Sequence, residues 1–309
     1  MSGHDRIDVA VGPTPLEWLA GWAVLSKAKI GVFVTLAAFT GALLAAGPAS
    51  GVAGIAPALE SALYIGLVAA ASGVFNQVIE RELDARMPRT MLRPLVTGQI
   101  RTRDAVLYGA LLALVGTTGL ATRFDVLAAL LSLATLLAYT LVYTPLKRVS
   151  SFNTTVGAIP GAMPPLIGYV AIAGAPGPWG LYLFATIFVW QFPHFLAIAW
   201  LYRDDYRAGG MKMLPALPNS AGLAGRQALV YALTLLPVSL LPVLRGEAGA
   251  FYAIGTLILG GGYALSAALF AHRETAARAR GVLFTSLAYL PLLFSLVLLD
   301  PAVSRAFAS

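Results

Sequence analysis

The sequence contains no cysteine and very few charged residues. The lack of cysteine excludes disulfides, thiolate metal sites and a cysteine nucleophile. Only 11% of the 309 residues are charged and 58% are hydrophobic, whereas about 25% are charged in a typical soluble protein. This composition predicts an integral membrane protein. The net charge of +7 does not indicate nucleic acid binding, because the basic residues lie in short segments between apolar runs.

Nine apolar runs are long enough to cross a hydrocarbon core of roughly 30 Å, which takes about 20 helical residues. The runs lie near residues 29–47, 58–79, 105–122, 125–144, 155–174, 178–200, 227–244, 249–271 and 281–299. The sequence therefore predicts an all-α integral membrane protein with nine transmembrane helices.

The Lys and Arg residues predict the orientation. A cytoplasmic N-terminus places every one of them on the inside except Arg123, Arg245 and Arg305. This asymmetry over short loops is what the positive-inside rule describes. The C-terminus is then outside.

The chain divides into three parts. Residues 1–28 form a cytoplasmic segment in which Thr14-Pro15-Leu16-Glu17 is a capping box, followed by two tryptophans. This segment is either a short helix at the bilayer surface or the first turn of the first span. Residues 29–300 form one nine-helix domain, and 301–309 are a tail. Two long inside loops, 80–104 and 201–226, begin with acidic residues and lie four helices apart, which suggests a pseudo-repeat of 29–144 and 155–271 plus the helix 281–299.

A column of polar side chains stands at the end of the second run. Asn76, Glu80 and Asp84 are spaced four residues apart, so on a continuing helix they share one face at intervals of about 6 Å. Carboxylate and amide oxygens suit Mg²⁺ held together with a substrate phosphate. The alternative is that the acids pair with nearby arginines in a solvated loop. Asn76 lies inside the apolar run, where an unpaired amide is costly, and this favours a functional site.

A second acidic pair, Asp204-Asp205, follows the sixth run on the same side and could complete a metal clamp with the column. Basic residues without compensating acids follow the column, and Lys147 and Arg148 occupy the next inside loop. Basic side chains and Mg²⁺ together commonly hold a diphosphate. Residues that only set the membrane topology would be similar in number.

Further polar residues lie towards the same side. Asn153 opens the fifth run, where Pro160, Pro164 and Pro165 predict a broken helix. His194, in the sixth run, is either a capping group near the interface or a haem ligand or proton carrier.

The motif Asn76-x3-Glu80-x3-Asp84 resembles the first acidic motif of the UbiA-type intramembrane prenyltransferases. Within that superfamily, further segments resemble the protohaem IX farnesyltransferase (haem O synthase) family, and the resemblance extends from the first helix to Pro215. These segments are Met87-x-Arg89-Thr90-x2-Arg93-Pro94, Tyr143-Thr144-x-Leu146-Lys147-Arg148, Asn153-x3-Gly157-x3-Gly161-Ala162-x-Pro164-Pro165, Phe192-Pro193-His194-Phe195 and Asp205-Tyr206-x-Ala208-Gly209-x3-Met213-Leu214-Pro215.

The resemblance implies an enzyme whose nine helices surround a central cavity, in a bacterial-type inner membrane with its site facing the cytoplasm. It implies transfer of the farnesyl group of farnesyl diphosphate to a vinyl group of haem B, with addition of water, to give haem O. A haem A synthase is a candidate partner and membrane lipid surrounds the protein. The implied roles are Mg²⁺ binding and catalysis by Asn76, Glu80, Asp84 and Asp205, with Asp204 or water completing the metal shell, diphosphate binding by Arg89, Arg93, Lys147 and Arg148, and a haem contact by His194.

Two positions depart from the family pattern. Glu80 stands where the superfamily usually has aspartate, and Gly209 stands where a second aspartate would follow Asp205 by four residues. The number of magnesium ions therefore stays open. Two other functions also stay open: a UbiA-type prenyltransferase acting on an aromatic acid or quinone precursor, and a membrane transporter.

Overall fold

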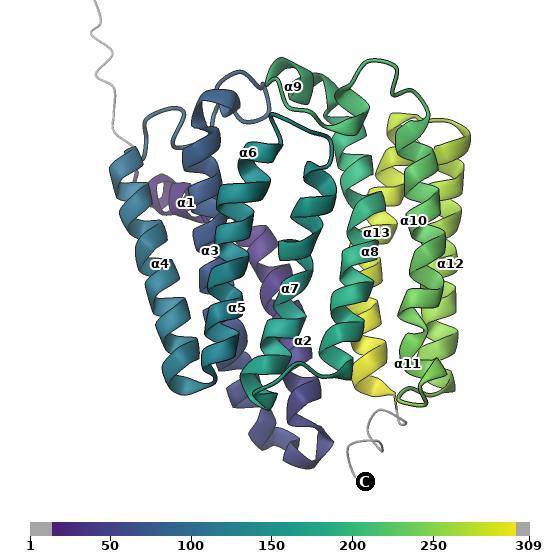
Figure 1. Cartoon of the computed structure of the whole chain (residues 1–309). Coiled ribbons are helices and arrows are strands. Elements are labelled where there is room, and N and C mark those ends of the chain that lie inside the picture. Colours follow the sequence, from purple (N-terminus) through teal and green to yellow (C-terminus); the bar gives the residue numbers. More distant parts are fainter. Residues whose placement is uncertain (1–13, 301–309) are drawn as a thin grey trace, which may run out of the picture.

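The computed structural model describes residues 14–300, and every regular element in this range is a helix. Nine of the described segments are long and apolar enough to cross a membrane, as predicted, and Figure 1 shows them standing side by side. Seven spans are single helices: α2 (Ala28–Ala46), α3 (Ile55–Asp84), α4 (Thr102–Arg123), α7 (Asn153–Ala173), α8 (Pro178–Leu201), α12 (Ala250–His272) and α13 (Ala276–Leu299).

The other two spans are composite. Helix α5 (Val126–Leu137) continues through a π-helical segment (Ala138–Tyr143) into α6 (Thr144–Leu146), and α10 (Leu223–Ser239) continues into α11 (Leu241–Leu244). The connections carry two 3₁₀ segments, η1 (Pro48–Gly54) and η3 (Leu214–Ala216), and the short helix α9 (Arg203–Ala208).

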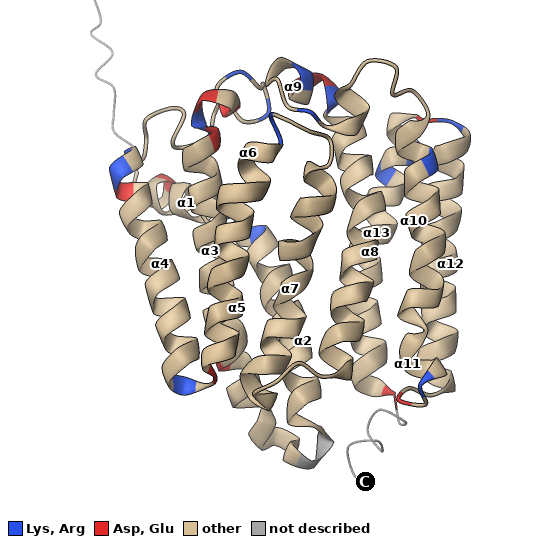
Figure 2. Cartoon of the chain, in the orientation of Figure 1, with Lys and Arg blue, Asp and Glu red and all other residues tan. Residues whose placement is uncertain are grey.

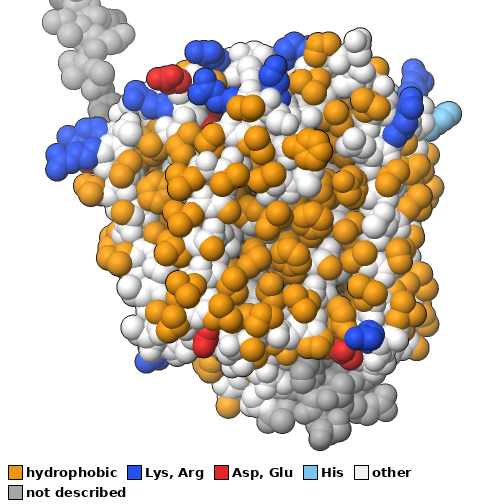
Figure 3. Space-filling view, viewed as in Figure 1, with side chains coloured by type: hydrophobic (Ala, Val, Ile, Leu, Met, Phe, Trp, Pro, Cys, Tyr) orange, Lys and Arg blue, Asp and Glu red, His pale blue; other side chains and the backbone are white. Residues whose placement is uncertain are grey.

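The outer surface of the bundle is apolar. Figure 3 shows hydrophobic side chains covering its middle, with charged side chains near the two ends. In the most apolar stretch of most spans only 28–39% of the residues are buried, but the fraction reaches 61% in α7 and 50% in α8. Helices α7 and α8 are therefore central, and the others present one face to lipid.

Helix α7 is continuous, so the predicted break is wrong. Its three prolines remove three amide donors, but the helix is surrounded largely by protein, where such defects are tolerated. Small residues let α2 approach its backbone closely. A Cβ on Gly41 would lie 1.9 Å from the carbonyl oxygen of Pro165, and one on Gly168 would lie 2.0 Å from that of Ala38.

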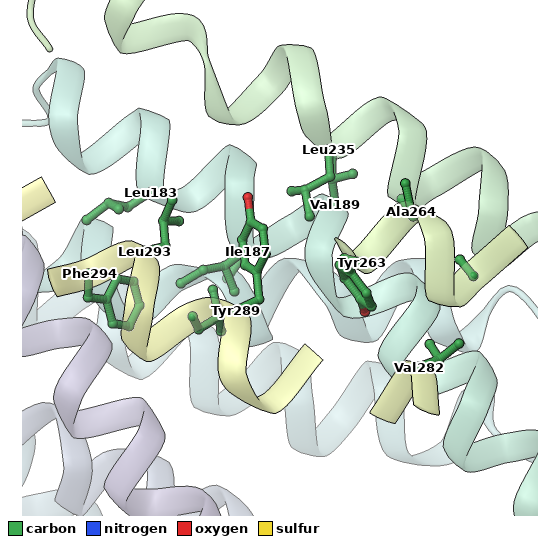
Figure 4. Close-up of a cluster of buried hydrophobic side chains, with 14 of the residues drawn as sticks. Leu183, Ile187, Val189, Leu235, Tyr263, Ala264, Val282, Tyr289, Leu293 and Phe294 are labelled. Carbon is green, nitrogen blue, oxygen red and sulfur yellow. The ribbon is translucent and has the colours of Figure 1, made fainter. Parts of the chain in front are cut away.

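The C-terminal helices pack around an apolar core, which Figure 4 shows between α8, α10, α12 and α13. Its largest fully buried members are tyrosines: the Tyr263 hydroxyl donates to the carbonyl oxygen of Trp190 at 3.1 Å. Tyr289 lies beside it, with ring centroids 5.9 Å apart. This core holds α8 in place from the side opposite α7.

Helix α1 (Pro15–Leu25) is separate from the first span, so this segment is not the first turn of that span, and its place at the bilayer surface stays a prediction. Thr14 and Glu17 form the predicted capping box, with the Glu17 carboxylate accepting from the Thr14 amide at 2.8 Å. Lys27 then takes a left-handed backbone conformation with φ of 50°, and α2 begins at the next residue. Figure 1 shows α1 lying across the bundle near one end.

Most charged side chains of the described residues gather at that same end (Figure 2). The loops between α3 and α4 and between α8 and α10 meet there. The connections from α4 to α5 and from α11 to α12 lie at the other end, and Arg123 ends α4 while Arg245 follows α11. The predicted segregation of basic residues is thus present in three dimensions for the part of the chain described. Arg6, Arg305 and the tail lie outside the described residues. The assignment of this end to the cytoplasm stays a prediction.

Candidate active site

The acidic column is built on the last turns of α3. This helix has 30 residues and is therefore about 45 Å long, more than the hydrocarbon core requires. It continues through Asp84, beyond the predicted start of the loop at residue 80. Asn76, Glu80 and Asp84 are all buried, with 1%, 4% and 1% of their surfaces exposed. The solvated-loop alternative does not fit such burial.

A basic side chain contacts each carboxylate of the column. The Lys147 ammonium donates to Glu80 Oε1 at 2.8 Å, and the Arg93 guanidinium pairs with Asp84 Oδ2. Burial alone would lower the pKa of Lys147, but the neighbouring Tyr143 and the Glu80 carboxylate together raise it above its ordinary value. Lys147 is therefore a fixed positive charge beside the column.

Lys27 holds the third member of the column, a role that sequence reasoning missed. Its ammonium donates to Asn76 Oδ1 at 2.6 Å. The Gln77 amide also donates to the carbonyl oxygens of Val24 and Leu25 at 3.1 and 2.9 Å, which ties the end of α1 to α3. In the sequence Lys27 is one of the basic residues that predict the topology. Its left-handed backbone aims the side chain inward, and the sequence carries no clear sign of that conformation.

The π-helical segment supplies the far wall of the site. Thr144 accepts from the Asn76 amide at 3.1 Å and donates to the carbonyl oxygen of Tyr139 at 2.9 Å. Lys147 lies 4.6 Å from the ring centre of Tyr143. A π-helical segment inside a helix frequently marks a functional site. Here it places Tyr139 and Tyr143 beside Lys27 and Lys147, and it leads into Thr144, the first residue of α6.

The second acidic motif reaches the same region through Asp205. Its carboxylate lies 3.8 Å from the Arg89 guanidinium, which also lies 4.9 Å from the centre of the Tyr202 ring. Gly209 packs against Met87: a Cβ there would meet the Met87 sulfur at 2.9 Å. The loop after α3 and the loop after α8 are therefore in direct contact, and an aspartate at 209 would not fit without movement.

Asn153 fixes the remaining loop. Its amide donates to the carbonyl oxygens of Ser150 and Lys212 at 2.7 and 3.1 Å, and the Lys212 amide donates to the Lys147 carbonyl at 2.6 Å. The polar residue that opens α7 thus joins the segment carrying Lys147 to the segment that follows Asp205.

Three of the predicted site residues lie away from the column. Asp204 is exposed and pairs with Arg207 at 2.8 Å, and Arg148 is exposed. The Nδ1 atom of His194 forms a hydrogen bond of 2.7 Å with Ser286 on α13, and its ring stacks on Trp190. His194 therefore faces α13 rather than α3.

The residues of the column fit a hard cation. Among residues 14–300 no three His, Asp or Glu side chains are close enough to form a complete metal site by themselves. Asp84, however, has one buried carboxylate oxygen, Oδ1, with no hydrogen-bond partner among the described residues. An orphaned buried carboxylate oxygen beside amide and carboxylate neighbours is the donor set expected for Mg²⁺ shared with a ligand's phosphate oxygens.

Known proteins resemble this chain over most of its length. The model of the UbiA prenyltransferase family matches residues 32–288. A protein of Solibacter usitatus (strain Ellin6076) named protoheme IX farnesyltransferase is 43% identical over 242 residues, which cover 78% of this chain and 83% of that protein. The protein of the same name from Koribacter versatilis (strain Ellin345) is 40% identical over 299 residues, covering 94% and 96%.

Two solved structures share the fold. An apo UbiA homolog from Aeropyrum pernix K1 superposes with a TM-score of 0.67 at 20% identity, covering 87% of this chain and 97% of that one. A UbiA homolog from Archaeoglobus fulgidus bound to GPP and Mg²⁺ gives a TM-score of 0.65 at 16% identity, covering 90% and 100%.

Proposed function

Because the chain belongs to the UbiA prenyltransferase family, we propose that it transfers the farnesyl group of farnesyl diphosphate to a vinyl group of haem B. Water adds in the same reaction, and the products are haem O and diphosphate. The choice of haem as acceptor is supported by the relatives named protoheme IX farnesyltransferase, which align over most of the chain. A diphosphate substrate is supported by the buried acidic column and by the basic side chains of Arg93 and Lys147, which contact its carboxylates.

The diphosphate binds at the end of the bundle where the two loops meet. Arg89, Arg93 and Lys147 hold it, and Lys27 joins them because it already lies beside Asn76. Arg148, exposed on the adjacent loop, contacts the outer phosphate. Guanidinium and ammonium groups suit this role because they stabilise the charge that grows on the leaving group.

Asn76, Glu80, Asp84 and Asp205 would hold Mg²⁺, which when bound neutralises charge on the departing diphosphate. Asp204 faces solvent and reaches the metal only if α9 shifts, so we assign it a smaller part in metal binding than Asp205. Arg93 and Lys147, which here pair with Asp84 and Glu80, turn to the phosphate oxygens when the diphosphate binds. The residues of the column are thereby released for the cation.

Cleavage of the carbon–oxygen bond sends its electron pair to the diphosphate and leaves an allylic cation. The Tyr139 and Tyr143 rings face the ammonium groups of Lys27 and Lys147, and when those lysines turn to the diphosphate the ring faces stabilise the allylic cation. The vinyl group of haem attacks the farnesyl carbon with its π electrons. Water then adds to the new cation and loses one proton, which balances the charge.

His194 contributes a contact to the haem. Ser286 and Trp190 fix its ring through Nδ1 and by stacking, and no described residue bonds to Nε2. The site faces the cytoplasm in a bacterial-type inner membrane. Both substrates are amphiphiles with an anionic end, so a site at the junction of lipid and water suits them.

The test is product analysis with purified protein, farnesyl diphosphate and Mg²⁺. With haem B we expect a product whose mass has increased by one farnesyl group and one hydroxyl group, and no product with 4-hydroxybenzoate. A product with the aromatic acid and none with haem would overturn the proposed acceptor. Transport of haem without any covalent product would overturn the enzymatic function itself.

A further inference from the structure

A second cationic pocket lies beyond the end of α8, separate from the acidic column. Its volume is about 450 Å³, and it shares no lining residue with the candidate active site. The lining combines Trp200, Arg203 and Arg207 with apolar Leu217 and Pro218. Because α8 ends at Leu201, the pocket lies at the level where this span leaves the hydrocarbon.

The charged residues of the pocket lining are two arginines and one glutamate. Glu274 accepts hydrogen bonds from the Trp200 indole at 3.1 Å and from the amides of Gly222 and Gly225 at 3.1 and 2.7 Å. Its carboxylate therefore braces the wall and is not directed at the guanidinium groups. Two arginines are left to set the charge that the pocket presents.

The Arg203 guanidinium is positioned in advance. One of its N–H groups donates to the carbonyl oxygen of Trp200 at 2.8 Å, and the Arg203 Cζ atom lies 4.3 Å from the centre of the Trp200 ring. A guanidinium has five N–H donors, and most of those of Arg203 have no hydrogen-bond acceptor among the described residues, so they can bind a ligand. The Arg207 guanidinium pairs with the exposed carboxylate of Asp204. Such an exposed ion pair is weak, so a phosphate can replace the carboxylate as the partner of Arg207.

We propose that this pocket binds the phosphate of an anionic phospholipid headgroup. Paired guanidinium groups are the preferred partners of phosphate oxygens. The apolar Leu217 and Pro218 fit the glycerol and the first acyl carbons, which a free phosphate does not possess. Tryptophan beside basic residues at the end of a span is also typical of the headgroup region.

The test uses purified protein in detergent without prenyl or haem substrates, so its result does not depend on the proposed reaction. The thermal midpoint and lipid adducts in native mass spectrometry are measured with phosphatidylglycerol, with phosphatidylcholine of the same chains, and with inorganic phosphate. The variant Arg203→Gln/Arg207→Gln is compared with Arg103→Gln/Arg280→Gln, which removes two exposed charges elsewhere.

We expect phosphatidylglycerol alone to raise the midpoint of the wild type. The pocket variant should lose more than half of that shift together with one lipid adduct, and the control should keep both. An undiminished shift in the pocket variant, or an equal shift with phosphatidylcholine, would refute the site. An equal shift with inorganic phosphate would refute lipid as the occupant. If the double variant does not fold, Arg207→Gln alone serves, because it disturbs only an exposed pair.

Discussion

Replacing Asp84 by asparagine tests the column most directly, since the new side chain has the same shape and no charge. The carboxylate has two distinct oxygens: Oδ2 pairs with Arg93, and Oδ1 is buried without a partner among the described residues. We expect turnover to fall by roughly 10²–10³-fold, the effect of removing one group that stabilises transition-state charge, about 2.7–4 kcal/mol. The Mg²⁺ concentration for half-maximal rate should rise at the same time.

The cost to stability should be smaller. Removing one partner of a buried ion pair costs about 3–5 kcal/mol, whereas a surface pair is worth about 0–1 kcal/mol. The Arg93 side chain is 21% exposed, which places the loss between these limits, at about 2 kcal/mol. Asp84→Asn should therefore remain folded, as judged by its elution from a sizing column and its thermal midpoint in detergent.

Asp104→Asn is the matched control. Asp104 pairs with Arg101 at 2.8 Å on the same end of the molecule, but the two side chains are 36% and 84% exposed. It should change neither turnover nor the Mg²⁺ dependence. If folded Asp84→Asn kept more than half of the wild-type rate, or lost rate with an unchanged Mg²⁺ dependence, Asp84 would not be a metal ligand.

Three further predictions follow from close contacts. Gly41→Ala should destabilise the protein by about 1–3 kcal/mol and lower its thermal midpoint, because the new Cβ would meet the Pro165 backbone. Gly31→Ala should be neutral or slightly stabilising, because the space around Gly31 is open. Equal midpoints for the two would contradict close α2–α7 packing. Lys27→Gln removes a charged hydrogen bond worth about 1.5–3 kcal/mol. It should therefore lower kcat/KM for farnesyl diphosphate roughly ten- to a hundredfold, and an unchanged kcat/KM would exclude Lys27 from the site. His194→Ala should alter the Soret band of bound haem, and an identical spectrum would show that His194 does not contact the haem.

Much of the fold follows from the sequence alone. The membrane spans can be recognised in the sequence because hydrocarbon tolerates little besides apolar side chains. The nine apolar runs of the sequence correspond to nine helical spans in the part of the chain described. The column of Asn76, Glu80 and Asp84 was predictable for a related reason. Helical periodicity is local, and four-residue spacing brings side chains onto one face without any knowledge of the rest of the chain. The capping box before α1 is local in the same way.

Other features depend on contacts between distant segments, and these only the tertiary structure decides. Lys27 joins the site because an αL backbone at one junction aims it at a residue 49 positions away. Helix α7 keeps its course through three prolines because its neighbours are protein. Asp205 faces Arg89 while Asp204 faces solvent, although adjacent acids look equivalent in a sequence. Residue spacing fixes which side chains share a helix face, but the packing of whole helices and loops fixes what that face meets.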